Sequence, residues 1–167
     1  MTKNARNEVS DSILLAIEPR HAWKILSGKK RYEFRTIVPK VDVKTVYMYA
    51  SAPVKRIVGT FEASGMFRLW TPAELWEITC KGAGISYEEY RAYFGERLAN
   101  AYEIANPVRF AEPINPRVNP YNHYRQPLWP DWYAPQNFVY LSAEQVECIL
   151  QAEEKLTSAK LGEDECP

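Results

Sequence analysis

The sequence predicts an α+β fold, a mixed β-barrel with flanking helices. Three observations support this fold class. Several short segments are apolar or alternating and rich in β-branched and aromatic residues, which is typical of strands. Other segments begin at a capping residue and end near a glycine, as helices do. Gly59 and Gly65 lie inside one strand pattern and indicate the bulges or bends of a small barrel.

The first half of the chain predicts strands with one helix between them. The apolar run 12–19 is typical of a buried strand, and Pro19 suits the first turn of a helix over 20–28. Gly28 suits the end of that helix. Residues 31–38 alternate between apolar and charged side chains, which predicts a half-buried strand with a charged face. Two more strands are predicted over 44–51 and 54–67.

The second half begins with two predicted helices, 71–84 and 86–95. Each starts with a capping box, in which Thr71 precedes Glu74 and Ser86 precedes Glu89 by three residues. A strand over 98–114 follows, then an irregular stretch over 115–135 and a final helix over 142–156. Long irregular stretches inside a domain are usually functional or mobile.

The length of 167 residues fits one domain with a real core. We expect a disordered tail at 1–11, the domain at 12–156 and an acidic tail at 157–167. No run approaches the roughly 18 apolar residues that span a bilayer, and the polar start lacks the apolar region of a secretory signal. The sequence therefore predicts a cytoplasmic protein that does not contact a membrane.

Three cysteines without a C-x-x-C pair and only two histidines indicate neither a disulfide framework nor a zinc site. We predict no metal and no cofactor. His21 lies on the first predicted helix and is expected at the surface or in a cap. His123 lies in the irregular stretch, and no spacing connects either histidine to a nucleophile, so a Ser/His/Asp triad is not indicated.

The formal net charge is zero, but the charges are segregated. Residues 20–56 hold ten Lys or Arg against two acidic residues, Glu33 and Asp42. Acidic residues gather instead in residues 142–167. A basic segment in a neutral protein is typical of a surface that meets phosphates, although two solvated faces would give the same pattern.

The stretch GKKRYEFR, residues 28–35, gathers four cations around one acidic residue, Glu33. On a strand, Glu33 and Arg35 project to the same face, and Lys30 lies just before it. Two cations and a carboxylate in a cleft can grip a phosphate and bind a base edge or a sugar hydroxyl. The alternative is an exposed salt-bridge network worth about 0–1 kcal/mol per pair.

Four of these residues resemble the G-x-K-x-x-E-x-R signature of the ASCH domain, a member of the PUA-like superfamily; they are Gly28, Lys30, Glu33 and Arg35. Three further segments are similar to a subgroup of the family described as transcriptional regulators; they are YASAPVKRIVGTFE (49–62), AGISYEEYRAYFG (83–95) and APQNFVYL (134–141). The resemblance covers roughly residues 13 to 150. It implies a PUA-like barrel with a cleft, in which the signature residues line one wall, and RNA binding.

The resemblance also extends to enzymes. One branch hydrolyses the acetyl amide of N4-acetylcytidine with a lysine that matches Lys30 and a threonine nucleophile where this chain has Glu33. That branch also uses a glutamate near the start of the second helix, where this chain reads KGAGIS (81–86). Other ASCH proteins have been linked to cleavage of single-stranded RNA. Whether this protein is an enzyme stays open; as a hydrolase, amidohydrolase or ribonuclease, it would use Lys30 and Glu33 as catalytic residues.

The irregular stretch interleaves aromatic residues with cations, as sites for single-stranded nucleic acids do. Its rings would either stack on bases and cover the ligand or close a gap in the barrel. Ser51 could add a hydroxyl to the cleft. The residues expected to contact nucleic acid are Gly28, Lys29, Lys30, Arg31, Glu33, Arg35, Ser51, Tyr124, Arg125, Trp129 and Trp132.

The function predicted from the sequence is RNA binding, with recognition of single-stranded or modified nucleotides in a basic cleft. The partner would be RNA or a modified nucleotide. Two alternatives stay open: a hydrolase of modified nucleosides or RNA, and a regulatory protein-interaction module that uses the aromatic stretch. The sequence identifies no protein partner.

Overall fold

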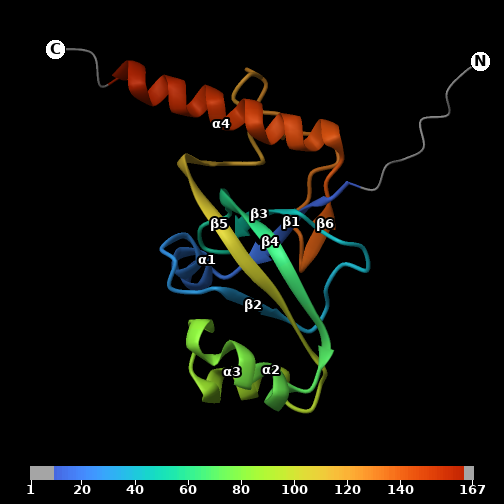
Figure 1. The fold of residues 1–167 in the computed structure, drawn as a ribbon. Coiled ribbons are helices and arrows are strands. Elements are labelled where there is room, and N and C mark those ends of the chain that lie inside the picture. Colours follow the sequence, from blue (N-terminus) through green and yellow to red (C-terminus); the bar gives the residue numbers. More distant parts are fainter. Residues whose placement is uncertain (1–9, 164–167) are drawn as a thin grey trace, which may run out of the picture.

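The computed structural model describes residues 10–163. The elements in chain order are β1 (Ser12–Ile17), α1 (Pro19–Leu26), β2 (Tyr32–Arg35), β3 (Thr45–Ala50), β4 (Arg56–Trp70), α2 (Pro72–Thr79), the 3-10 helix η1 (Cys80–Gly82), α3 (Tyr87–Phe94), β5 (Ala99–Ile114), β6 (Phe138–Tyr140) and α4 (Ala143–Glu163). The six strands form one curled, mixed sheet with helices around it (Figure 1). The predicted α+β fold, a PUA-like mixed barrel with flanking helices, is confirmed as a half-barrel.

The strand order of the sheet is β2-β5-β4-β3-β1-β6. β1 and β3 are parallel, with Ser12 opposite Thr45 and Ile17 opposite Ala50, because α1 and β2 provide the crossover between them. The other pairings are antiparallel. In the described part of the chain β2 and β6 are the edges, so the sheet curls without closing.

The long strands β4 and β5 bend where glycines were expected to mark bulges. The register of their pairing shifts between Ile57 and Gly59 and between Ala63 and Gly65. A Cβ at Gly59 would lie 2.2 Å from the Val108 carbonyl oxygen, so only glycine allows the two backbones to approach this closely. The predicted bulges are therefore confirmed, and they give the sheet its curvature.

Helices cover opposite ends of the half-barrel (Figure 1). α2 and α3 lie at one end and pack against β2, and α4 lies across the other end, beside the irregular stretch 115–135. Both predicted N-caps form, since Thr71 Oγ1 and Ser86 Oγ accept hydrogen bonds from the backbone N–H three residues on. The two glutamates do not complete a capping box, because Glu74 accepts from the Thr71 hydroxyl and Glu89 pairs with Arg20. The end that holds α2 and α3 carries the candidate site.

Some predicted boundaries were wrong. The strand predicted over 31–38 is only Tyr32–Arg35, and its charged face is covered. The helix predicted over 71–84 ends at Thr79 and tightens into η1. α4 runs to Glu163, so residues 157–163 are helical rather than frayed, while 1–9 and 164–167 lie outside the described residues. Boundaries are the part of a fold that local patterns determine least.

Candidate functional site

The site begins at the turn between α1 and β2. Gly28 adopts a φ of +77°, which ends α1 and lets the chain reverse into β2. Lys30 follows, and its side chain is only 2% exposed. Gly84, at φ +68°, makes room for it, because a Cβ at Gly84 would lie 2.7 Å from the Cβ of Lys30. Two glycines far apart in the sequence thus position one buried lysine.

Lys30, Glu33 and Arg35 form a connected cluster. Lys30 Nζ donates a hydrogen bond to the Ala83 carbonyl oxygen at 2.8 Å and lies 3.8 Å from Glu33 Oε2. An Arg35 Nη2 atom lies 3.0 Å from Glu33 Oε1. The same guanidinium donates to the Ala16 carbonyl oxygen and to Asn137 Oδ1, so it ties β2 to the far edge of the sheet. Arg35 therefore holds Glu33 in place from one side while Lys30 faces it from the other.

Burial changes the acid–base behaviour of Lys30. Removal of its ammonium from water lowers the pKa of Lys30, and the Glu33 carboxylate opposes part of that shift. A buried lysine is costly unless it is paired, and a lysine with a perturbed pKa at a cavity wall is typical of functional sites. The cluster is thus not the exposed network that the alternation of residues 31–38 also permitted.

A second charged cluster faces the first from α1 and α3. Arg20 forms ion pairs with Glu89 and with Glu18. The His21 side chain is 14% exposed, and its Nε2 lies 3.7 Å from Glu89 Oε1. Burial lowers the pKa of His21, and the hydrogen bond from Arg20 lowers the pKa of Glu89. The expectation of His21 at the surface was wrong, because α3 covers this side of α1.

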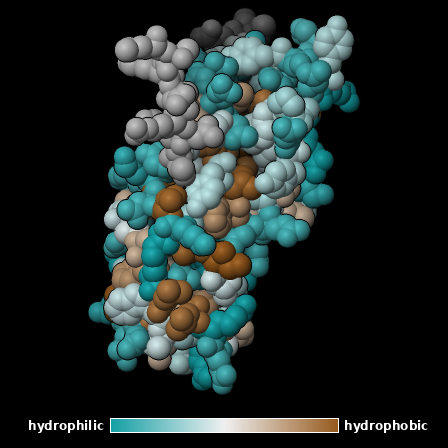
Figure 2. Space-filling model, turned by 90° about the vertical axis from the view of Figure 1, so that its right-hand side faces the viewer, coloured by the Kyte–Doolittle hydropathy of each residue, from teal (hydrophilic) through white to brown (hydrophobic). Residues whose placement is uncertain are grey.

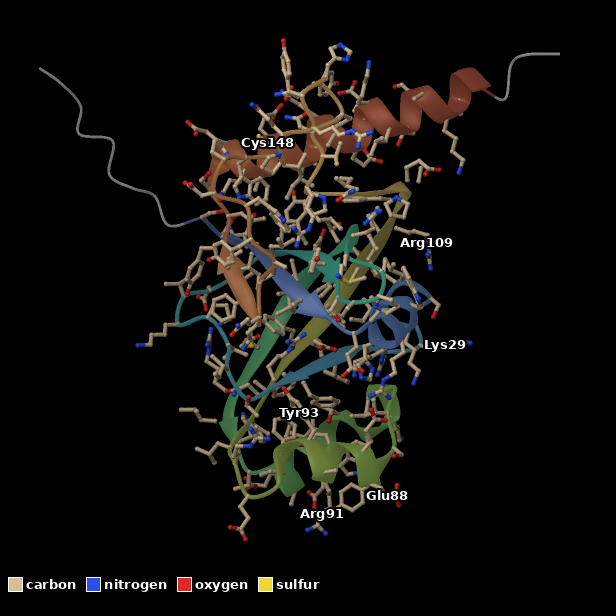
Figure 3. All side chains as sticks on the ribbon, turned by 180° about the vertical axis from the view of Figure 1, so that it is seen from behind. Lys29, Glu88, Arg91, Tyr93, Arg109 and Cys148 are labelled. Atoms are coloured by element: carbon tan, nitrogen blue, oxygen red, sulfur yellow. The ribbon has the colours of Figure 1, made fainter. Side chains whose placement is uncertain are left out.

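These two clusters surround a cavity of about 480 Å³. Its size falls in the range of roughly 300–1,000 Å³ that is typical of small-molecule sites. The cavity is lined by Ala16, Glu18, Arg20, His21, Lys30, Glu33, Phe34, Arg35, Ser51, Ile85, Glu89, Tyr93, Pro135 and Gln136. In Figure 3, Tyr93 lies on the side of α3 that faces β2, whereas Glu88 and Arg91 point away. We call this cavity the central pocket.

Four of the residues expected at the site line the central pocket: Lys30, Glu33, Arg35 and Ser51. Gly28, Lys29 and Arg31 do not line it. Gly28 shapes the turn, and Lys29 and Arg31 are exposed beside it. Figure 3 shows Lys29 projecting outward from the end of α1. The expected basic cleft is therefore divided, because the pocket contains both charges and the exposed cations Lys29 and Arg31 flank Lys30 in the sequence without lining the pocket. We call Lys29 and Arg31 the rim.

The irregular stretch 115–135, called the aromatic stretch from here on, lies mostly away from the central pocket. Trp129 and Trp132 pack into a core with Tyr49 and with α4, and the Tyr124 side chain is 87% exposed at the same end of the molecule. Arg125 is also exposed. None of these four expected contact residues lines the central pocket. Pro135, the last residue of the stretch, and Gln136, directly after it, line the pocket.

Three residues of the pocket lining, His21, Glu89 and Tyr93, were not expected from the sequence, and neither was Gly84, which packs against Lys30. Glu89 has a local signal, since it lies three residues after the N-cap Ser86, where its carboxylate pairs with Arg20. The other three depend on the packing of α3 and the loop before it against α1, a long-range contact. Lys24 Nζ donates to the Gly84 carbonyl oxygen at 2.7 Å across this junction.

Residues 10–163 contain neither a metal-binding cluster nor a membrane-spanning helix. No group of three or more His, Cys, Asp or Glu residues in that range is arranged to hold a metal ion. In the same range, no helix is both long and apolar enough to cross a membrane. On the face shown in Figure 2, hydrophobic side chains gather in the middle and lower parts within hydrophilic surroundings.

The half-barrel sheet, the signature cluster and the covering helices define a PUA-like domain with a charged pocket. The chain belongs to the ASCH domain family, whose model matches residues 15–114. It is 28% identical over 141 residues to an ASCH domain-containing ribonuclease of Zymomonas mobilis, an alignment that covers 82% of this chain and 88% of the relative. The transcriptional-regulator-like subgroup is not supported by these comparisons.

Solved structures agree with the fold. The crystal structure of ASCH from Zymomonas mobilis matches with a TM-score of 0.72 and 24% identity, over 84% of this chain and 94% of that chain. A tyrosine-to-phenylalanine mutant of the same protein matches with a TM-score of 0.73, also at 24% identity, over 84% of this chain and 97% of that chain. At this identity the match establishes the architecture alone.

Proposed function

We propose that the protein binds single-stranded RNA and that the central pocket receives one nucleotide of the strand. The observation that carries the proposal is the buried Lys30 ammonium, which lies at the wall of an open cavity between the Ala83 carbonyl oxygen and Glu33. Such burial costs free energy that a purely structural role would avoid. The exposed cations Lys29 and Arg31 beside the pocket suit a phosphate backbone.

RNA is favoured over other ligands by two lines of support. The chain belongs to the ASCH family, and a relative in that family is named as a ribonuclease. The basic segment 20–56, with ten Lys or Arg against two acidic residues, contributes Lys30 and Arg35 to the pocket lining and carries the exposed Lys29 and Arg31.

The test compares Lys30→Met with Lys29→Met in a fluorescence-polarisation titration of labelled single-stranded RNA. We expect Lys30→Met to weaken binding at least tenfold, because the pocket loses a positive charge and leaves Glu33 less compensated. Lys29→Met removes an exposed cation, so it should weaken binding about threefold or less and reduce the salt dependence of affinity. Equal effects of the two substitutions would contradict the pocket as the binding site.

Cleavage of the bound RNA is the second candidate function. It is favoured by the ribonuclease relative and by the acid–base groups His21, Lys30 and Glu89 at one pocket. A denaturing gel of the same samples tests it. Shortened RNA with wild type and intact RNA with Lys30→Met would make the protein a ribonuclease, whereas RNA that stays intact with wild type would leave binding as its activity.

A further inference from the structure

The charged side chains of the central pocket neutralise one another. Its three cations are Arg20, Lys30 and Arg35, and its three carboxylates are Glu18, Glu33 and Glu89. Each cation lies within 4 Å of a carboxylate of the same pocket. His21 adds no charge near neutral pH, because burial lowers its pKa below the ordinary value. The pocket therefore has a formal charge of zero, although it lies in the most basic segment of the chain.

This balance selects against a phosphate inside the pocket. A phosphate would lose its hydration on entry and would meet as much negative as positive charge. An uncharged nucleobase loses far less hydration. Its edge carries donors that a Glu33 oxygen can accept and acceptors to which the Arg35 guanidinium can donate. The polar groups of the pocket thus match a base edge better than an anion.

The pocket also offers flat apolar surface. Tyr93 lines it from α3 and is 40% exposed, and Phe34, Ile85 and Pro135 line it as well. Figure 3 shows Tyr93 on the side of α3 that faces β2, and Tyr93 shares the pocket lining with Lys30, Glu33 and Arg35. An exposed tyrosine ring at the wall of a pocket is suited to stack on a planar base.

The unbalanced positive charge lies outside. Lys29 and Arg31 are exposed, and neither takes part in the ion pairs found among residues 10–163. Lys29 directly precedes Lys30 and projects outward in Figure 3, so a strand whose base enters the pocket can keep its phosphates near the rim.

We propose that the central pocket takes one uncharged nucleobase stacked on Tyr93, while the phosphates of the strand stay outside on Lys29 and Arg31. This inference rests on the proposed RNA binding and assigns its substrate class and a specificity-determining residue. It differs from the sequence-based expectation, in which Lys30 and Arg35 would neutralise phosphate.

The experiment uses single-stranded RNA octamers that carry 2-aminopurine at successive positions. We expect wild-type protein to quench the fluorescence at one position, as stacking does, and Tyr93→Leu to lose the quench and to bind about tenfold more weakly. Tyr93→Phe keeps the ring and should match wild type. Tyr87→Leu is the matched control, because Tyr87 is 42% exposed on the same helix but its ring packs at a tilt against Trp76 and does not line the pocket.

An abasic octamer with the same sugar–phosphate backbone separates base from phosphate recognition. We expect it to bind at least tenfold more weakly than the intact strand. Equal binding of the abasic strand, or unchanged affinity and quenching with Tyr93→Leu, would overturn this inference while RNA binding itself stands. No binding of intact RNA by wild type would overturn the proposed function and this inference together.

Discussion

The central pocket and the aromatic stretch 115–135 have similar compositions, cations mixed with aromatic rings, but opposite structures. In the pocket, the side chains of Lys30, Glu33 and Arg35 are largely buried and are paired beside open space. In the aromatic stretch, the two tryptophans are packed against α4 and the sheet, and Tyr124 and Arg125 face solvent. The comparison teaches that the same residue types can pack into a core in one region and line a cavity in another, depending on long-range packing.

The aromatic stretch has a clear structural task. The Trp132 ring lies 5.7 Å from the Tyr49 ring and 5.3 Å from the Trp129 ring, both edge to face. Leu128 is buried beside them against Ile149 of α4. These contacts attach α4 to an end of the half-barrel that β-strands do not close.

Of the substitutions proposed here, Gly84→Ala should have the largest effect on RNA affinity, because it disturbs the packing of Lys30 at the central pocket. The new Cβ would clash with Lys30 and would force a side chain into φ +68°. We expect RNA affinity to fall at least tenfold. Gly28→Ala is the control, since its Cβ would meet no atom within 4 Å and its φ of +77° costs only about 1–2 kcal/mol of stability.

Fluorescence polarisation measures the RNA affinity of both variants, and urea unfolding measures their stability. Together they distinguish a disturbed pocket from general destabilisation. If Gly28→Ala weakens RNA binding as much as Gly84→Ala does, the loss comes from general destabilisation and the packing of Gly84 against Lys30 is not needed for binding.

Trp132→Ala and Tyr124→Ala test whether the aromatic stretch contributes to stability rather than to RNA binding. Trp132 is partly buried in the core below α4, so its truncation should lower the free energy of unfolding by about 1–3 kcal/mol. Tyr124 is exposed, and its truncation should change that free energy by less than about 0.5 kcal/mol. We expect both variants to bind RNA within twofold of wild type. Weaker RNA binding by a folded Tyr124→Ala protein would mean that the aromatic stretch contacts the RNA.

The sequence predicted what depends on neighbouring residues. The N-caps Thr71 and Ser86, the turn at Gly28 and the bulges at Gly59 and Gly65 follow from local backbone requirements, and each was found. Alternation also correctly placed Glu33 and Arg35 on one face of β2. It could not predict that this face is covered, because the cover comes from α1, α3 and the end of β1.

The composition of the pocket depended on the same long-range packing. His21 and Glu89 are 68 positions apart, and their approach to 3.7 Å follows from the docking of α3 on α1 rather than from any local pattern. The pairing of charges could not be predicted either. A count of charged residues over 20–56 omits Glu18 and Glu89, which form ion pairs with Arg20.

The smallest expected effect concerns the pH dependence of stability. Burial lowers the pKa of His21 in the folded state, so below pH about 6.5 the unfolded chain binds a proton that the folded chain does not. The contribution of neutral His21 to stability is therefore present above pH 6.5 and is lost as the pH falls toward the folded-state pKa. His21→Gln should flatten this part of the profile.

Urea unfolding of wild type, His21→Gln and His123→Gln between pH 7.5 and pH 5 measures that slope. His123 is the other histidine of the chain and lies exposed in the aromatic stretch, so its removal should leave the profile as in wild type. A steeper loss of stability in His21→Gln than in wild type would mean that the carboxylates near His21, Glu33 first, outweigh the effect of burial on its pKa. His21 would then be charged near neutral pH, and the central pocket would hold a net positive charge that could accept a phosphate after all.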